Sequence, residues 1–279
     1  SPILSGHLIK VTWGEIEPAD GVFNFSILDS RMANATDQGL SVSLMVWVAS
    51  PDGVMAPWLV NDELVPTVRV VGSKSHPTAT FAWYFSDVYQ QRHTRMINAL
   101  ARHLEGLPEA NRRWIRGFQP ALGSTGDFTP WHGTPVDHEF QISKTQWLEY
   151  ADNRTSMFVD AFARSGIPLT WNFGDSIDNN CSAVDCDQLQ ARSRLQFLFS
   201  RLPPNNTNVK LGMVSHSYQL NGEADYLRAW QPYLSAGVDR RSHGEVGDGS
   251  GRELEQRFWC DLFAVRPLLL AQSEAAHCA

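Results

Sequence analysis

Four carboxylates in this chain stand at or just beyond the ends of apolar, strand-like segments. They are Glu15 after residues 8–13, Asp127 after 114–122, Asp175 after 167–173 and Glu245 after 238–244. In a parallel α/β fold the carboxyl ends of the strands meet at one edge, where ligands and catalytic groups collect. Two carboxylates held close together there can act as an acid/base and a nucleophile. These four positions are therefore candidates for catalysis or binding.

Asp127 and Glu245 have neighbours that suit such chemistry. Trp131 and His132 follow Asp127, and an exposed aromatic ring beside a carboxylate suits the binding of a sugar ring. His243 precedes Glu245, and a positive neighbour would keep that carboxylate ionised, as a nucleophile requires. The alternatives are an Asx turn at Asp127 and an ordinary acidic surface loop around Glu245.

Further candidates stand at the other strand ends. They are Trp13, Trp47 and Trp171 as possible sugar platforms, His216 and Tyr218 after residues 209–214, and Asp248 as a competitor of Glu245. Most aromatic side chains of a barrel fill its core, so a structural role is the alternative for each tryptophan.

Apolar runs and amphipathic stretches alternate along the chain, which is typical of a parallel α/β fold. The predicted strands are residues 8–13, 40–48, 114–122, 167–173, 209–214 and 238–244. The predicted helices are residues 26–38, 86–104, 145–164, 187–202, 223–234 and 251–265. A weaker strand signal over residues 66–71 is expected to belong to a long excursion after residues 40–48. No linker divides the chain, and we expect a single (β/α)-barrel domain over residues 1–279.

One segment has a specific pattern. Residues 13–29 read Trp-x-x-Ile-Glu-Pro-x-x-Gly-x-Phe-x-Phe-x-x-Leu-Asp, between the first strand and the first helix, and a second strand follows Gly39. This order resembles the second and third β/α units of clan A glycoside hydrolases. These are retaining sugar-cleaving barrels such as the β-galactosidases and xylanases.

The resemblance implies an α/β fold of the (β/α)8 TIM type, incomplete at one or both ends of this chain. The six predicted strands would be strands two to seven. It also implies that Asp127, after strand four, protonates the leaving oxygen, although clan A enzymes usually carry a Glu after Asn there. Glu245, at the end of strand seven, would attack the anomeric carbon of a poly- or oligosaccharide. Tyr218, in a His-x-Tyr sequence at the end of strand six, would hydrogen-bond the nucleophile.

Composition and missing motifs exclude several other classes. The formal net charge of −7 at pH 7 argues against nucleic acid or an anionic membrane surface as a partner. No apolar run approaches the ~20 residues of a membrane span. Phosphate-cradling glycine loops, a serine-hydrolase elbow and a His-Glu-x-x-His pair do not occur in the sequence. We therefore expect no cofactor and no metal.

Several features indicate a secreted, extracellular protein. Asn-x-Ser/Thr sequons stand at Asn24, Asn34, Asn153, Asn180 and Asn205, and N-linked glycans are expected there unless the pattern is coincidental. Cys181 and Cys186 lie in a polar segment where a local disulfide fits, which leaves Cys260 and Cys278 for a second bridge. A zinc site is the rival, but the cysteine spacings match no common zinc pattern. The chain begins at Ser1, which suits removal of a signal peptide.

A second function belongs to a different class. The Asp in place of Glu at position 127, the sequons and the missing strands favour a non-catalytic, glycosylated carbohydrate-binding or structural protein on the same barrel. Activity on a polysaccharide panel would separate the two functions. In a retaining enzyme the Asp127 and Glu245 carboxyls should lie about 5–5.5 Å apart. Asp175 and Glu15 are the next carboxylates to consider if the strand register differs.

Overall fold

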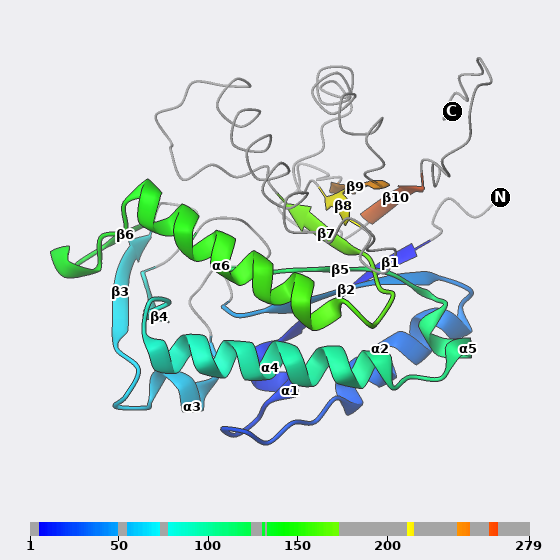
Figure 1. Ribbon diagram of the computed structural model, residues 1–279, viewed down its shortest axis with the longest axis horizontal. Helices are drawn as coiled ribbons and strands as arrows, with labels where there is room; N and C mark the ends of the chain where they lie inside the picture. The colour runs from blue at the N-terminus through cyan, green and yellow to red at the C-terminus, as the bar shows by residue number, and fades with distance from the viewer. Residues whose placement is uncertain are drawn as a thin grey trace, which may run out of the picture.

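The described part of the chain is organised around two β-sheets and the helices that cover them (Figure 1). The computed structural model describes residues 6–49, 55–72, 78–123, 130–131, 133–172, 211–214, 239–245 and 257–261. A seven-stranded sheet lies beside a three-stranded one. The larger sheet carries the strand ends at which the candidate residues were expected.

The larger sheet runs in the order β1-β2-β5-β7-β8-β9-β10. Its strands are β1 Gly6–Thr12, β2 Ser41–Trp47, β5 Ile115–Gln119, β7 Leu169–Asn172, β8 Leu211–Val214, β9 Asp239–Glu245 and β10 Arg257–Asp261. Neighbours from β1 to β9 pair in parallel, and β10 pairs antiparallel with β9. Because β10 also lies beside β1, the sheet curls back on itself (Figure 1).

This topology confirms the predicted barrel fold. Every predicted strand from 8–13 to 238–244 overlaps a strand of the parallel series, in the predicted order. One prediction is wrong: the expected helix over 251–265 contains strand β10 instead. Its centre, Phe258 and Trp259, combines residues that favour strands, and β9 offers an edge with which to pair. The predicted helices 187–202 and 223–234 lie outside the described residues.

The two faces of β1 and β2 pack against different neighbours. Ile9, Val11 and Val46 belong to the main core, which the helices also line. Leu8 and Met45 form a separate apolar group together with Trp47. Successive side chains of a strand point to opposite faces of the sheet, so this second group faces the inside of the curled sheet.

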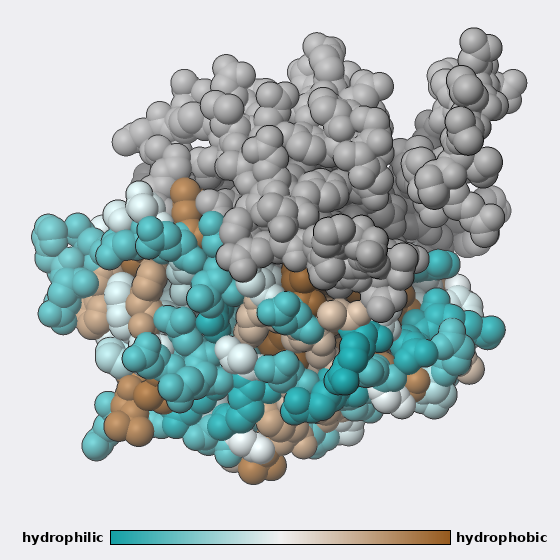
Figure 2. Space-filling view, viewed as in Figure 1, coloured by the Kyte–Doolittle hydropathy of each residue, from teal (hydrophilic) through white to brown (hydrophobic). Residues whose placement is uncertain are grey.

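Among the described residues, three long helices cover the outer face: α2 Ser26–Asp37, α4 Asp87–Glu105 and α6 Lys144–Phe162 (Figure 1). They confirm the helices predicted over 26–38, 86–104 and 145–164. The described part of the surface in the same view is mostly hydrophilic, with scattered hydrophobic residues (Figure 2). The Ser86 hydroxyl accepts a hydrogen bond from the Tyr89 amide at the start of α4, and a Ser143–Gln146 capping box starts α6. The short helices are α1 Trp13–Ile16, α3 Pro57–Val60, α5 Glu109–Arg112 and a 3-10 turn, His138–Phe140. None of the helices in the described ranges is long and apolar enough to span a membrane.

The smaller sheet is built from excursions of the chain beyond the larger one. Its strands are β3 Thr67–Gly72, β4 Ala79–Ala82 and β6 Gly133–Pro135, with β3 in the centre and antiparallel to both neighbours. The excursion predicted around residues 66–71 is thereby confirmed. Because β3 and β4 follow β2 while β6 follows β5, this sheet joins segments that leave the carboxyl ends of two barrel strands.

Candidate functional site

The carboxyl ends of the parallel strands define the candidate active site. Thr12, Trp47, Gln119, Asn172, Val214 and Glu245 are the last residues of β1, β2, β5, β7, β8 and β9. Because these strands are parallel and adjacent, their carboxyl ends meet at one edge of the sheet. Glu245 therefore occupies a strand end through its backbone, and Trp171 lies one residue before another.

The predicted catalytic residues fall largely outside what the structure describes. Asp127, His132, Asp175, His216 and Tyr218 lie outside the described residues. For Trp171 and Glu245 the description covers the backbone alone. Their roles as acid/base, nucleophile, hydrogen-bond donor and sugar contacts stay predictions. The side chains of Trp13, Glu15, Trp47 and Trp131 are described, and they have four different environments.

Trp47 has the environment that best suits a ligand. Its ring is only partly buried, at the end of β2 on the inner face of the sheet. The Lys10 ammonium lies 4.4 Å from the ring centroid, a cation–π contact. The indole NH of Trp47 is buried, and no hydrogen-bond acceptor for it is found among the described residues. A buried donor of this kind is normally satisfied, so the group is available to an oxygen of a ligand.

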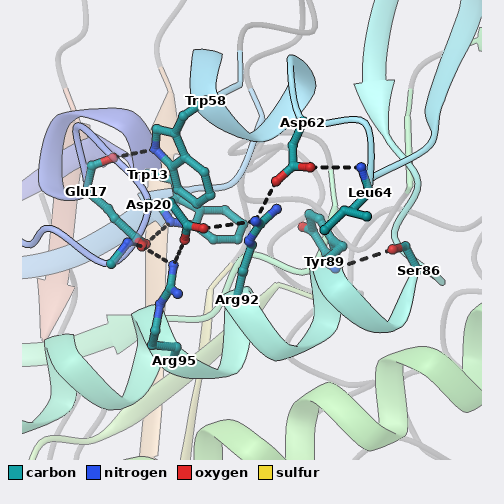
Figure 3. Close-up of polar contacts among 11 residues, drawn as sticks. Trp13, Glu17, Asp20, Trp58, Asp62, Leu64, Ser86, Tyr89, Arg92 and Arg95 are labelled. Atoms are coloured by element: carbon teal, nitrogen blue, oxygen red, sulfur yellow. Dashed lines mark hydrogen bonds and ion pairs between the residues drawn. The ribbon is translucent and has the colours of Figure 1, made fainter.

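Trp13 has no exposed face, which corrects its assignment as a sugar platform. It is completely buried, in edge-to-face contact with Trp58 and Tyr89. Its indole NH donates a 2.6 Å hydrogen bond to the carboxylate of Glu17, which is itself fully buried. Trp13 therefore belongs to the core beneath the strand ends, where it fixes the position of Glu17 (Figure 3).

Glu17 organises the turn after α1 and ties it to two other elements (Figure 3). One carboxylate oxygen accepts hydrogen bonds from the Gly21 amide, at 2.8 Å, and from the Arg95 guanidinium of α4. The backbone carbonyl of Glu17 accepts a 2.7 Å hydrogen bond from the indole NH of Trp58 in α3. A buried carboxylate is stable only when it is paired and hydrogen-bonded, and these contacts meet that need.

Two arginines of α4 extend this network (Figure 3). Arg92 pairs with Asp62 at 2.5 Å and with Asp20 at 2.8 Å, and its guanidinium lies 5.5 Å from the Trp58 ring centroid. Arg95 bridges Asp20 and the buried Glu17. The backbone hydrogen bond from Leu64 and the contacts of Arg92 lower the pKa of Asp62, against a small opposing effect of desolvation. The network fastens the segments after β1 and β2 onto one helix.

Glu15 is engaged in local structure. Its carboxylate accepts a 2.6 Å hydrogen bond from the Thr12 amide in the capping box of α1, and it pairs with Arg31 of α2 at 2.8 Å. Desolvation raises the pKa of Glu15, but the Thr12 hydrogen bond and the charge of Arg31 outweigh it, so the net shift is downward. Glu15 is thus held ionised as a helix cap. Its side chain is still partly exposed, and its role as a sugar contact stays a prediction.

Trp131 is also buried, which corrects the expectation of an exposed ring beside Asp127. It stacks on Tyr84 with the ring centroids 5.7 Å apart, and it contacts Phe81 and Trp83 of the β4 region. The Tyr84 hydroxyl donates a 2.9 Å hydrogen bond to the Pro130 carbonyl. This aromatic cluster anchors residues 130–131 against the β4 region. Trp131 therefore has a structural role in the segment between β5 and β6.

Sequence reasoning missed Glu17, Arg92 and Arg95 as members of this region. Glu17 follows Trp13 by four residues within the recognised motif, a spacing that suits one helical turn. Arg92 and Arg95 are three residues apart and share one side of α4. The carboxylate of the motif residue Asp29 is hydrogen-bonded to the Nε2 atom of His103 in α4, at 2.8 Å. The motif therefore encodes how the first β/α unit docks on α4.

Metal ligation finds no support in the described part of the chain. Within the described ranges no three His, Cys, Asp or Glu side chains converge as a metal site would require.

A family comparison bears on the same region. Residues 5–111 match the model of a glycoside hydrolase family described as Beta-galactosidase. The matched residues contain β1, the motif of residues 13–29, β2 and α4. The predicted resemblance to clan A glycoside hydrolases is confirmed over these residues, which match a glycosidase family model. No curated protein sequence matches the chain.

Solved xylanases are similar to the chain. The intracellular xylanase of Thermoanaerobacterium saccharolyticum with xylotriose is 13% identical, over 88% of this chain and 68% of its own, with a TM-score of 0.46. The xylanase of Bispora with xylobiose is 12% identical, over 86% of this chain and 63% of its own, with a TM-score of 0.49. A glycosylated endo-β-1,4-xylanase of Gloeophyllum trabeum is 13% identical, over 85% and 62%, with a TM-score of 0.45. The chain thus spans about two thirds of the length of these proteins.

Proposed function

We propose that the protein is a retaining glycoside hydrolase that acts on a poly- or oligosaccharide. The observation that carries the proposal is the match of residues 5–111 to a glycosidase family, in a chain whose Glu245 ends a parallel strand of the same sheet. In this mechanism Glu245 attacks the anomeric carbon, and a covalent glycosyl intermediate forms. Asp127 protonates the leaving oxygen and then activates water, while Tyr218 donates a hydrogen bond to Glu245.

In this proposal the substrate binds at the carboxyl ends of the parallel strands. The partly buried ring of Trp47 offers a stacking surface. Its indole NH, which has no acceptor among the described residues, offers a hydrogen-bond donor for a sugar hydroxyl. The Glu17 network supports the segment that follows β1. The Glu17 carboxylate accepts hydrogen bonds from Trp13 of α1 and Arg95 of α4, and its backbone carbonyl accepts one from Trp58 of α3. Trp171, His132 and His216 are further contacts to the sugar in this proposal.

The first test is turnover of the Glu245→Gln variant on a panel that includes β-galactosides and xylo-oligosaccharides. The amide keeps the shape and removes the nucleophilic charge, so kcat should fall by at least about a thousandfold while oligosaccharide binding survives. Asp248→Asn, three residues further on, is the matched control and should keep near-normal turnover. Wild-type turnover in the Glu245→Gln variant would refute the assignment.

The same panel separates this proposal from a non-catalytic function. The Asp at position 127, where clan A enzymes usually have a Glu, is the observation that favours a binding or structural protein. Saturable binding of a sugar that the wild-type protein never cleaves would support that alternative. Loss of turnover in Asp127→Asn, with recovery by added azide, would support catalysis by a carboxylate at position 127.

We also propose that the protein is secreted, glycosylated and disulfide-bonded. The sequon residues Asn24, Asn34 and Asn153 have exposed side chains, as glycan attachment requires. Asn180 and Asn205 lie outside the described residues, as do Cys181, Cys186 and Cys278. Only the backbone of Cys260 is described.

Intact mass before and after enzymatic deglycosylation tests this second proposal. Protein from a eukaryotic secretory host should lose mass in steps that single Asn→Gln changes at Asn24, Asn34 and Asn153 remove. An unchanged mass would contradict glycosylation. Alkylation mapping should find Cys181 and Cys186 protected until reduction, and a free thiol at either position would contradict the proposed bridge.

A further inference from the structure

A basic basin lies at the opposite end of the strands from the candidate active site. It has a volume of about 470 Å³ and lies where β5 and the segment entering β7 begin. Its lining includes Arg112, Arg113, Arg116 and Arg164. β5 pairs with β7 where Phe118 lies beside Leu169, the first residue of β7, and the Phe118 amide donates a 2.8 Å hydrogen bond to the Pro168 carbonyl. The earlier residues of β5, Ile115 and Arg116, line the basin together with residues 164–168, which lead into β7.

Two of the four arginines are neutralised by acidic neighbours. Arg112 pairs with Glu109 at 2.6 Å and donates a 2.8 Å hydrogen bond to the Glu105 carbonyl. Arg164 lies 3.6 Å from the Glu105 carboxylate, with a mostly exposed side chain. These exposed pairs hold the rim of the basin together but contribute little binding energy of their own.

The other two arginines of the basin, Arg113 and Arg116, have solvent-exposed side chains. Neither forms an ion pair with any acidic residue in the described part of the chain. The Arg113 guanidinium lies 5.8 Å from the Trp114 ring centroid, a contact that leaves its NH groups available. The basin therefore carries excess positive charge in a chain whose formal net charge is −7. Planar guanidinium groups match the oxygens of phosphate and sulfate.

The turn between α6 and β7 leaves the basin unobstructed. Gly166 has a φ of +67°, and a Cβ built there would meet nothing within 4 Å. The neighbouring Ser165 is buried, where its hydroxyl donates to the Phe162 carbonyl and accepts from the Ile167 amide. The turn is thus held rigidly by its own hydrogen bonds, and its outer side stays open to solvent.

We propose that this basin binds a tetrahedral oxyanion, a sulfate or phosphate group, through Arg113 and Arg116. The anion is either free or esterified to a larger molecule such as a sulfated oligosaccharide. Because the basin lies at the amino-terminal ends of the strands, this site is separate from the proposed active site. Its occupation does not require glycosidase activity.

The test is calorimetric titration of the protein with sodium sulfate, sodium phosphate and a sulfated oligosaccharide, at constant ionic strength maintained with sodium chloride. We expect saturable binding that Arg113→Gln and Arg116→Gln each weaken by about tenfold, since each removes a charged hydrogen-bond donor. Arg69→Gln, on an exposed arginine of β3, is the matched control and should leave affinity unchanged. Activity toward neutral sugars should be the same in all variants.

The titrations distinguish an esterified ligand from a free anion and from the absence of a specific site. Tighter binding of the sulfated oligosaccharide than of its unsulfated counterpart and of inorganic sulfate would identify an esterified ligand, and equal affinity for both sulfates would identify a free anion. An absence of saturable binding with every probe would overturn the proposal. So would equal weakening in Arg69→Gln, because the interaction would then reflect overall charge.

Discussion

At the residue scale, Glu17 places a carboxylate where water is excluded. It is fully buried, and it accepts hydrogen bonds from the Trp13 indole, the Gly21 amide and the Arg95 guanidinium. Burial of an unpaired charge is prohibitive, so these partners make the arrangement possible. Removal of the carboxylate would leave the Trp13 donor buried without an acceptor, which carries its own penalty.

We therefore expect Glu17→Ala to lower the free energy of unfolding by about 3 kcal/mol, a value at the lower end for a broken buried pair because Arg95 is partly exposed. Equilibrium urea unfolding followed by tryptophan fluorescence measures this change. Glu149→Ala, at an exposed position of α6, should change stability by less than about 0.5 kcal/mol. Equal stability of the two variants would show that the network is not needed for the fold.

At the element scale, the smaller sheet depends on a glycine in β6. Gly133 has a φ of +150°, and a Cβ there would lie 2.3 Å from the Val71 carbonyl oxygen of β3. Real Cβ atoms do not approach backbone oxygens so closely, so a side chain at position 133 must push the two strands apart. β3 and β6 pair over only a few residues, and their register would not survive that shift.

Gly133→Ala should therefore lower the free energy of unfolding by about 2 kcal/mol or more. Hydrogen exchange of the β3 and β6 amides should accelerate more than that of β1 and β2, because the disruption is local. Gly39→Ala is the control: its φ is +74° but the added Cβ meets no atom within 4 Å. It should cost only about 1 kcal/mol and leave exchange in β3 unchanged.

At the scale of the whole molecule, His93 links stability to pH. It is completely buried, and aromatic rings of Trp13, Tyr89 and Phe158 lie against it. Within the part of the chain that the structure describes, its two ring nitrogens have no hydrogen-bond partner. Burial, with a smaller effect of the Arg154 charge, lowers the pKa of His93 from 6.5 to about 3. As the pH falls, His93 therefore becomes protonated near pH 6.5 in the unfolded chain, but only near pH 3 in the folded chain.

The sign of the effect follows from linkage. The contribution of neutral His93 is complete above about pH 6.5, and it decreases by about 1.4 kcal/mol per pH unit as the pH falls toward 3. Urea unfolding of His93→Phe between about pH 7 and pH 5 should give a correspondingly shallower pH dependence than the wild type. His138→Phe, at an exposed position, should retain the wild-type slope. Parallel slopes for wild type and His93→Phe would contradict the assignment.

The sequence by itself determined the elements that depend on local patterns. The apolar runs behind β1, β2, β5, β7, β8 and β9 predicted strands in the observed order, because alternation of strand and helix allows few parallel topologies. The helix predicted over residues 86–104 begins as expected, because Ser86 caps α4 through a contact between residues three apart. The motif of residues 13–29 also predicted the glycosidase class, because all of its residues lie in one continuous stretch of the sequence.

Only the tertiary structure decided what depends on distant contacts. Helical spacing predicted a helix over 251–265, but Arg257–Asp261 pairs with the edge of β9, a partner that no local pattern identifies. Trp13 and Trp131 read as candidate platforms, yet both are buried, because exposure is set by segments far away in the chain. The role of Glu17 as a buried ion-pair partner depends on Arg95 of α4, which is 78 residues away in the sequence. Periodicity and capping are local free energies, whereas burial and charge pairing exist only after the chain has folded.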